Sequence, residues 1–198
     1  MHEMTTDQLR QALLADRRAS FIRLRGGFPI PVAGAVYWLV LAYAGTQTDL
    51  RGWVSVAVWG SGLIFPLALL FAKLFSCDFM HDRTAAGDVL LPALIAMLLF
   101  WPMLAATVWT APQLAPLVLA IGMSLHWPVI GWSYGQTGIY TTHAVARAVV
   151  AFAIWQYLPD MRLTGLPLSV ALIYLATVAA IIVRARQMSA WQVPTALA

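Results

Sequence analysis

Two ionisable side chains lie inside long apolar stretches of the sequence, where burial is costly unless a residue has a function or a partner. They are His126 and Arg147. His143 precedes Arg147 by four residues, so these two side chains share one face of a helix. A histidine titrates near neutral pH and can relay a proton, and an arginine can bind an anionic group. The spacing therefore indicates a polar pocket within the apolar part of the chain.

The polar residues around the connection between these two stretches extend the candidate pocket. On a helix that rises 1.5 Å per residue, His126 lies about 12 Å and Arg147 about 10 Å from that connection, so they reach a similar depth. We predict a pocket that opens to the cytoplasm and binds a small anionic ligand. In the alternative interpretation, Arg147 extends to the interface and His126 bonds a backbone carbonyl or a threonine. The candidate ligand-binding residues are His126, His143, Arg147, Tyr134 and Tyr140.

Scattered histidines and acidic residues allow a second interpretation, a zinc site. Asp78 and His81 precede the third apolar stretch, and His126 and His143 would have to join them. Zinc needs three or four ligands in a defined geometry, and the sequence has no HxxxH or HExxH motif. Asp78 and His81 are therefore secondary candidates only, and we predict no metal and no cofactor. The absence of Walker and GxGxxG motifs favours a protein that is not an enzyme.

The composition shows that a lipid-embedded scaffold must position these residues. Of 198 residues, 61% are hydrophobic and 10% are charged, against about 25% charged residues in soluble domains. The mean hydropathy is +0.77. These values exclude an ordinary soluble domain and a disordered chain, and the single cysteine excludes a disulfide scaffold.

Six apolar stretches approach the roughly 20 residues that a helix needs to cross a bilayer. Pro66, Pro102 and Pro128 lie inside the second, third and fourth of them and predict kinks that can open a cavity. Tryptophans near the ends of the stretches, such as Trp38 and Trp53, are expected to anchor the helices at the interface. We predict an all-α integral membrane protein with six transmembrane helices at Phe28–Ala44, Trp53–Phe75, Val89–Trp109, Leu114–Tyr134, Tyr140–Leu158 and Pro167–Val183.

The basic residues divide unequally between the two sides of this arrangement. Arg51 and Arg162 fall on one side, and nine others fall on the opposite side. The positive-inside rule then places both termini in the cytoplasm. The nine are Arg10, Arg17, Arg18, Arg23, Arg25, Lys73, Arg83, Arg184 and Arg186.

The segment before the first stretch predicts an amphipathic helix over residues 5–25. Thr5 and Gln8 have the spacing of a capping box, and the arginines that follow suit anionic lipid head groups better than nucleic acid. We therefore divide the chain into a basic interfacial helix at 1–27, a six-helix bundle at 28–186 and a tail at 187–198.

The stretch Gly62-Leu-Ile-Phe-Pro66-Leu with Lys73 after it, and the run Ala115–Ile121, carry a resemblance to a known family. Together with the arginine-bearing segment before the first span, they resemble a family of small bacterial membrane proteins known only as a domain of unknown function. The resemblance implies a compact helical membrane domain in a bacterial inner membrane and brings no reaction, cofactor or catalytic residue.

Three classes of function remain open. We favour a small transporter- or channel-like protein with a pocket facing the cytoplasm. The alternatives are an intramembrane enzyme, with or without a metal, and a non-catalytic interaction or assembly protein. All three classes allow an oligomer.

Overall fold

The computed structural model describes residues 5–78 and 81–191, and in these ranges it contains helices and no strand. Short 3-10 segments at Arg25–Gly27 (η1), Gly87–Val89 (η2), Pro112–Leu114 (η3) and Pro159–Met161 (η4) connect several of the helices. Of the expected tail at 187–198, the last helix includes the residues up to Trp191, and 192–198 lie outside the described residues. The helices are α1 (Thr6–Arg23), α2 (Pro29–Gln47), α3 (Leu50–Ser61), α4 (Ile64–Leu74), α5 (Leu90–Leu98), α6 (Trp101–Thr110), α7 (Ala115–Gly122), α8 (Trp127–Ser133), α9 (Thr137–Tyr157) and α10 (Gly165–Trp191).

The expected architecture of several membrane-crossing helices is confirmed in outline. Among the described residues, five helical stretches are long and apolar enough to cross a membrane, and the pair α3–α4, bent by 50°, is a sixth if it counts as one span. The five stretches are Arg25–Gln47, Gly87–Thr110, Pro112–Ser133, Thr137–Tyr157 and Gly165–Ala190.

Two of these stretches, and the pair α3–α4, are interrupted, as their internal prolines predict. Helix α4 begins two residues before Pro66, and α6 and α8 each begin one residue before Pro102 and Pro128. A proline has no N–H to donate and cannot continue the helix that precedes it, but it fits the first turn of a new one. At the breaks the backbone forms tighter bonds, such as Phe100 N–H to the Met97 carbonyl at 3.1 Å and Trp127 N–H to the Ser124 carbonyl at 3.1 Å. The breaks therefore leave these backbone donors satisfied inside an apolar environment.

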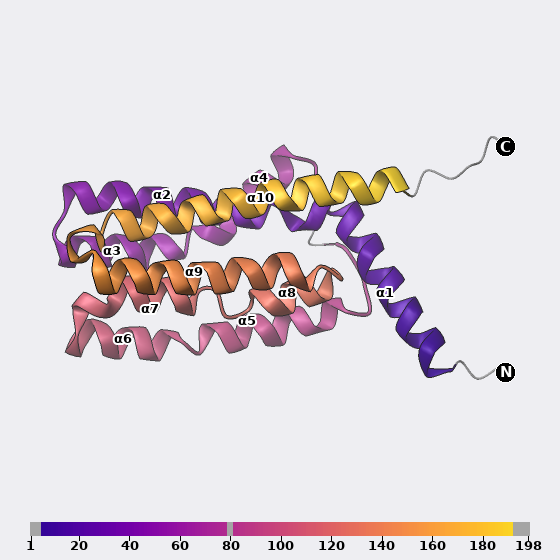
Figure 1. Ribbon diagram of the computed structural model, residues 1–198, viewed down its shortest axis with the longest axis horizontal. Helices are drawn as coiled ribbons and strands as arrows, with labels where there is room; N and C mark the ends of the chain where they lie inside the picture. The colour runs from indigo at the N-terminus through magenta and orange to yellow at the C-terminus, as the bar shows by residue number, and fades with distance from the viewer. Residues whose placement is uncertain (1–4, 79–80, 192–198) are drawn as a thin grey trace.

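The continuous helices α2, α9 and α10 form the centre of the bundle. Helix α10 packs along both α2 and α9, while α4 packs on α2 and α8 packs on α9 (Figure 1). Trp38 and Trp53 are fully buried here, and the Trp53 indole donates to the Leu41 carbonyl at 3.0 Å. The prediction that these two tryptophans anchor the interface is therefore wrong, because both rings face neighbouring helices. Trp109 is 87% exposed, as an interface anchor should be.

Helix α1 leaves the bundle at one end and projects from it (Figure 1). The predicted capping box is present, with Thr5 and Gln8 each accepting a bond from the other's backbone N–H. The connection between α4 and α5 holds the other end of α1, since Asp82 pairs with Arg23 at 2.7 Å and accepts a bond from the Ser20 hydroxyl. Arg17 lies over the Trp132 ring at 4.1 Å and ties α1 to α8.

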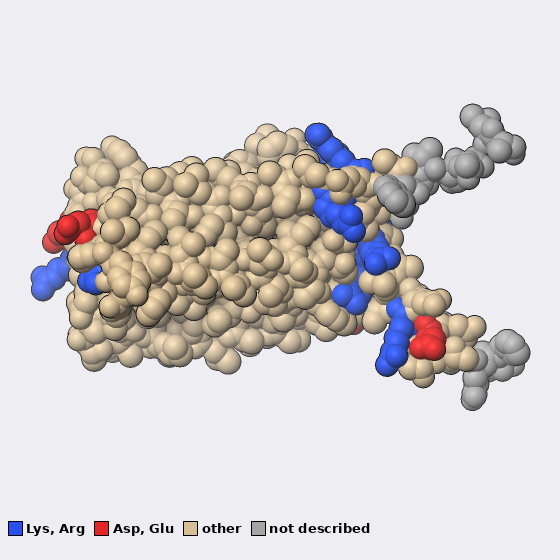
Figure 2. Space-filling model, viewed as in Figure 1, with Lys and Arg blue, Asp and Glu red and all other residues tan. Residues whose placement is uncertain are grey.

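Charged side chains gather at the two ends of the bundle, and its flank carries almost none (Figure 2). Most of the basic residues lie at the end where α1 joins, on α1 and at the ends of α4 and α10. Arg51 and Arg162 lie at the opposite end, beside Asp49 and Asp160. An apolar band between two charged ends is the surface that a membrane-embedded helical protein requires.

Candidate functional site

Arg147 lies at the centre of the bundle and has no exposed surface. Its guanidinium is 4.8 Å from the centre of the Trp38 ring on α2 and 5.3 Å from that of Tyr174 on α10. Nη1 donates to the Tyr174 hydroxyl oxygen at 2.8 Å, whereas Nε and Nη2 have no hydrogen-bond partner in the described part of the chain. No carboxylate within residues 5–78 and 81–191 forms an ion pair with it. Two aromatic faces and one hydroxyl thus hold a buried cation.

His143 lies one turn before Arg147 on α9 and is 2% exposed. Its Nδ1 is 2.8 Å from the Thr177 hydroxyl oxygen, and the only hydrogen of that hydroxyl goes to the Ile173 carbonyl at 2.8 Å. Nδ1 must therefore be the donor, and in the neutral ring Nε2 is an acceptor that has no partner among the described residues. The imidazole also stacks on Trp127, with 4.1 Å between ring centres.

Aromatic rings continue this stack toward the end of the bundle where α1 joins. Tyr140 stacks on Trp127 at 5.7 Å, and its hydroxyl donates to the Gly26 carbonyl at 2.6 Å. A Cβ atom at Gly26 would lie 2.9 Å from that hydroxyl, and the φ of +63° also favours glycine there. We call the whole stack the aromatic column, and it consists of Arg147, Tyr174, His143, Trp127, Tyr140 and Tyr134.

A cavity of about 290 Å³ lies beside the column, at the level of the three helix breaks. Residues on both sides of the α3–α4 break line it, together with the end of α5 and the turn between α7 and α8. Five residues bring a polar side-chain group to its wall, and the other lining residues are glycine, aliphatic, aromatic or sulfur-containing. The five are Ser61, Trp101, His126, Trp127 and Tyr174.

The cavity communicates with the flank of the bundle. Phe65 on α4 is 54% exposed, and Leu98 on α5 is 52% exposed, although both also line the cavity. Because these two exposed residues belong to α4 and α5, the open side of the cavity lies between these two helices. A ligand with apolar surface could therefore enter sideways, from the region where lipid tails would lie.

The five predicted ligand-binding residues do not share one open pocket. His126 lines the cavity, and its Nδ1 has no hydrogen-bond partner among the described residues. Tyr134, Tyr140, His143 and Arg147 are instead packed within the aromatic column. Sequence reasoning missed Tyr174, which belongs to the column and also lines the cavity. Its signal was a tyrosine in the middle of an apolar stretch, far from any interface.

The structure does not bring the secondary metal candidates together with the two buried histidines. Asp78 and His81 lie at the charged end of the bundle, where the His81 Nδ1 is 2.8 Å from the Asp78 carboxylate. Among the described residues no three histidines, cysteines or acidic residues come close enough to hold a metal ion. The carboxylate of Asp82 binds Arg23 and not Arg147.

Comparison with known proteins assigns the chain to a family but not to a function. No curated protein and no solved structure matches it. The family model described as "Family of unknown function (DUF7010)" matches residues 14–184, which include α2–α9 and most of α1 and α10. The chain belongs to this family of unknown function, as its resemblance to a domain of unknown function predicts.

Proposed function

We propose that this protein is a transport-type protein of the bacterial cytoplasmic membrane that takes a small amphiphile from the bilayer. The apolar wall of the cavity suits the body of such a ligand, and Ser61, His126 and Tyr174 suit a polar or anionic end. The observation that carries the proposal is the buried, uncompensated Arg147 beside that cavity. A membrane-buried ion without a counter-ion is costly to keep, and a functional role offsets that cost.

Tyr174 connects the charge of Arg147 to the ligand. Its oxygen accepts the bond from Arg147, so the phenolic hydrogen stays available for a second partner. A carboxylate, phosphate or carbonyl oxygen in the cavity would accept that hydrogen. Because the guanidinium lies directly behind the hydroxyl, its positive charge favours an anionic acceptor over a neutral one.

The proposal includes an orientation. We count the bent pair α3–α4 as one span, which gives six spans and places α1 and the end of α10 on the same side. The positive-inside rule assigns that side to the cytoplasm, since nine of the basic residues precede or follow spans there. The column then leads from the cavity toward the cytoplasmic surface.

A brominated fatty acid tests binding, because bromine quenches a tryptophan that it contacts and Trp101 and Trp127 line the cavity. We expect saturable quenching in lipid nanodiscs that an unbrominated fatty acid reverses. Tyr174→Phe and His126→Leu should each weaken it about tenfold, as expected for a lost bond to a charged group. Tyr157→Phe is the matched control, because Tyr157 is 75% exposed and belongs to α9, a helix that contributes no residue to the wall of this cavity. Equal quenching in all four proteins would refute the ligand site.

Thiol labelling tests transport separately from binding. In a Cys77→Ser background, Ser61→Cys places a thiol in the cavity wall, and Ser124→Cys places one at a neighbouring break where the side chain is 3% exposed. We expect a small cationic thiosulfonate reagent to label Ser61→Cys from either face of sealed vesicles and to spare Ser124→Cys. Labelling from one face only would refute transport and leave a binding protein.

A further inference from the structure

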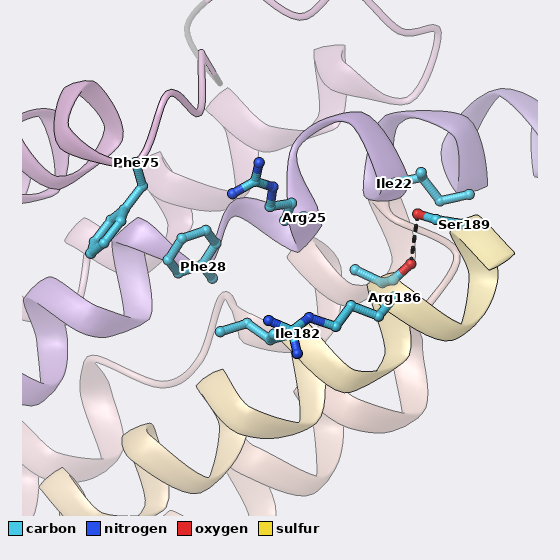
Figure 3. Close-up of a pocket in the computed structure, with 8 residues that line it drawn as sticks. Ile22, Arg25, Phe28, Phe75, Ile182, Arg186 and Ser189 are labelled. Carbon is cyan, nitrogen blue, oxygen red and sulfur yellow. Dashed lines mark hydrogen bonds between the residues drawn. The ribbon is translucent and has the colours of Figure 1, made fainter.

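A second pocket, of about 650 Å³, lies at the end of the bundle where α1 joins (Figure 3). Arg25 comes from η1 and Arg186 from α10, on the two sides of the pocket. Phe28 and Phe75 form an apolar wall, with 5.2 Å between their ring centres, and Ile182 extends that wall along α10. The pocket thus has two cationic groups at one place and aromatic and aliphatic surface beside them.

The two arginines of this pocket have no anionic partner in the described part of the chain. Arg25 and Arg186 are exposed, and neither guanidinium takes part in an ion pair or hydrogen bond with residues 5–78 or 81–191. Arg23, by contrast, is satisfied by Asp82 at 2.7 Å. Arg25 also holds a φ of +47°, a conformation that side chains other than glycine rarely adopt. The chain therefore keeps an arginine in a strained position where its charge is unmatched within the protein.

We propose that this pocket binds the phosphate of an anionic phospholipid, with an acyl chain against Phe75 and Ile182. The pocket lies where the apolar flank meets the basic end of the bundle, which is the level of lipid phosphates for a protein embedded by that flank (Figure 2). Guanidinium groups bind phosphate through paired, charge-assisted hydrogen bonds.

The apolar wall favours a lipid over a soluble phosphate. A free phosphate would use Arg25 and Arg186 and gain nothing from the neighbouring phenylalanines. Phe75 is 42% exposed although it packs on Phe28, so its outer face stays open to a lipid tail. This site is independent of the cavity between α4 and α5, and its occupation by a lipid needs no transport.

Native mass spectrometry and thermal shift in detergent test the proposal with three probes: phosphatidylglycerol, phosphatidylcholine and glycerol 3-phosphate. We expect one phosphatidylglycerol to bind tightly, at least about tenfold more tightly than either other probe. Arg25→Gln and Arg186→Gln should each weaken phosphatidylglycerol binding about tenfold. Ile182→Ser should weaken phosphatidylglycerol binding without changing the binding of glycerol 3-phosphate. Arg184→Gln is the matched control, because Arg184 lies on the same helix and contacts Gln136 at 3.4 Å.

Three results would overturn the proposal. Equal affinity of the wild-type protein for phosphatidylglycerol and phosphatidylcholine would show that the charge of the head group is not recognised. Equal losses in Arg184→Gln and Arg186→Gln would indicate attraction by the whole basic end, not by the pocket. Glycerol 3-phosphate that binds as tightly as the lipid would assign the pocket to a soluble phosphate. If a glutamine variant does not fold, the comparison of the three probes on the wild-type protein still decides.

Discussion

Replacing Arg147 by methionine separates its role in stability from its role in binding. Methionine keeps an unbranched stem of similar reach and removes the charge. The variant loses the bond to Tyr174, worth about 2 kcal/mol for a charged donor, and two cation–π contacts of about 1 kcal/mol each. The variant also no longer buries an ion that no carboxylate compensates, and this removes an unfavourable term of several kcal/mol. Because the terms nearly cancel, we expect the free energy of unfolding of Arg147→Met to lie within about 2 kcal/mol of the wild type.

Arg147→Ala undergoes the same electrostatic change and also leaves a void between Trp38 and Tyr174. Truncation of a long buried side chain to alanine costs about 2–5 kcal/mol, so this variant should unfold at least about 4 °C below Arg147→Met, given about 2–4 °C per kcal/mol for a chain of this size. Neither variant should bind the brominated fatty acid.

Unfolding can be followed by tryptophan fluorescence, since Trp38 stacks on the guanidinium. Arg51→Met is the control, because Arg51 is exposed at the far end of the bundle and its loss should change stability by less than about 0.5 kcal/mol. The reasoning is refuted if Arg147→Met is as unstable as Arg147→Ala. Arg147 would then be a structural cross-link, and its unpartnered nitrogens would carry no sign of function.

Three further predictions concern the scaffold. Gly45→Ala would place a Cβ atom 2.0 Å from the Leu163 carbonyl oxygen, so it should lower the free energy of unfolding by at least about 2 kcal/mol, while Gly138→Ala, with nothing within 4 Å, should not. Asp82→Asn breaks the ion pair that holds α1, and hydrogen exchange of the α1 amides should rise about fivefold for a loss of about 1 kcal/mol; unchanged exchange would mean that other contacts hold the helix. Burial raises the pKa of the Cys77 thiol. The protonated thiol therefore makes its full contribution to stability below the ordinary thiol pKa of about 8.5, and this contribution declines as the pH rises through the higher pKa of the folded state. Thermal melts should show that the wild type loses stability relative to Cys77→Ala only at alkaline pH.

The sequence predicts the elements of this fold better than their contacts. Apolar length alone locates the membrane-crossing stretches, because lipid imposes the same length on every helix. Pro66, Pro102 and Pro128 mark the breaks for an equally local reason, the missing N–H of proline. Which helices touch is not local, and nothing in one sequence shows that α10 lies between α2 and α9.

The misplaced tryptophans and the missed tyrosine illustrate that limit. Position along a helix suggests that Trp38 anchors an interface, but the direction in which its side chain points places it against Arg147. Arg147 itself can be recognised as exceptional from sequence, because no topological role explains an arginine there. Its partner Tyr174 lies 27 residues away on another helix, so only the packing of α9 on α10 could reveal it.

The contrast between continuous and broken helices has a mechanical consequence. Helices α2, α9 and α10 are continuous over 19, 21 and 27 residues, so they resist shortening. The stretches α3–α4, α5–α6 and α7–α8 are instead jointed near their middles, and each can shorten by folding at its joint, which costs less than compressing a regular helix. When a bilayer thins, a protein adapts where its chain bends most easily. Here those joints surround the cavity, so the thickness of the membrane and the volume available to a ligand are linked by the geometry of the fold.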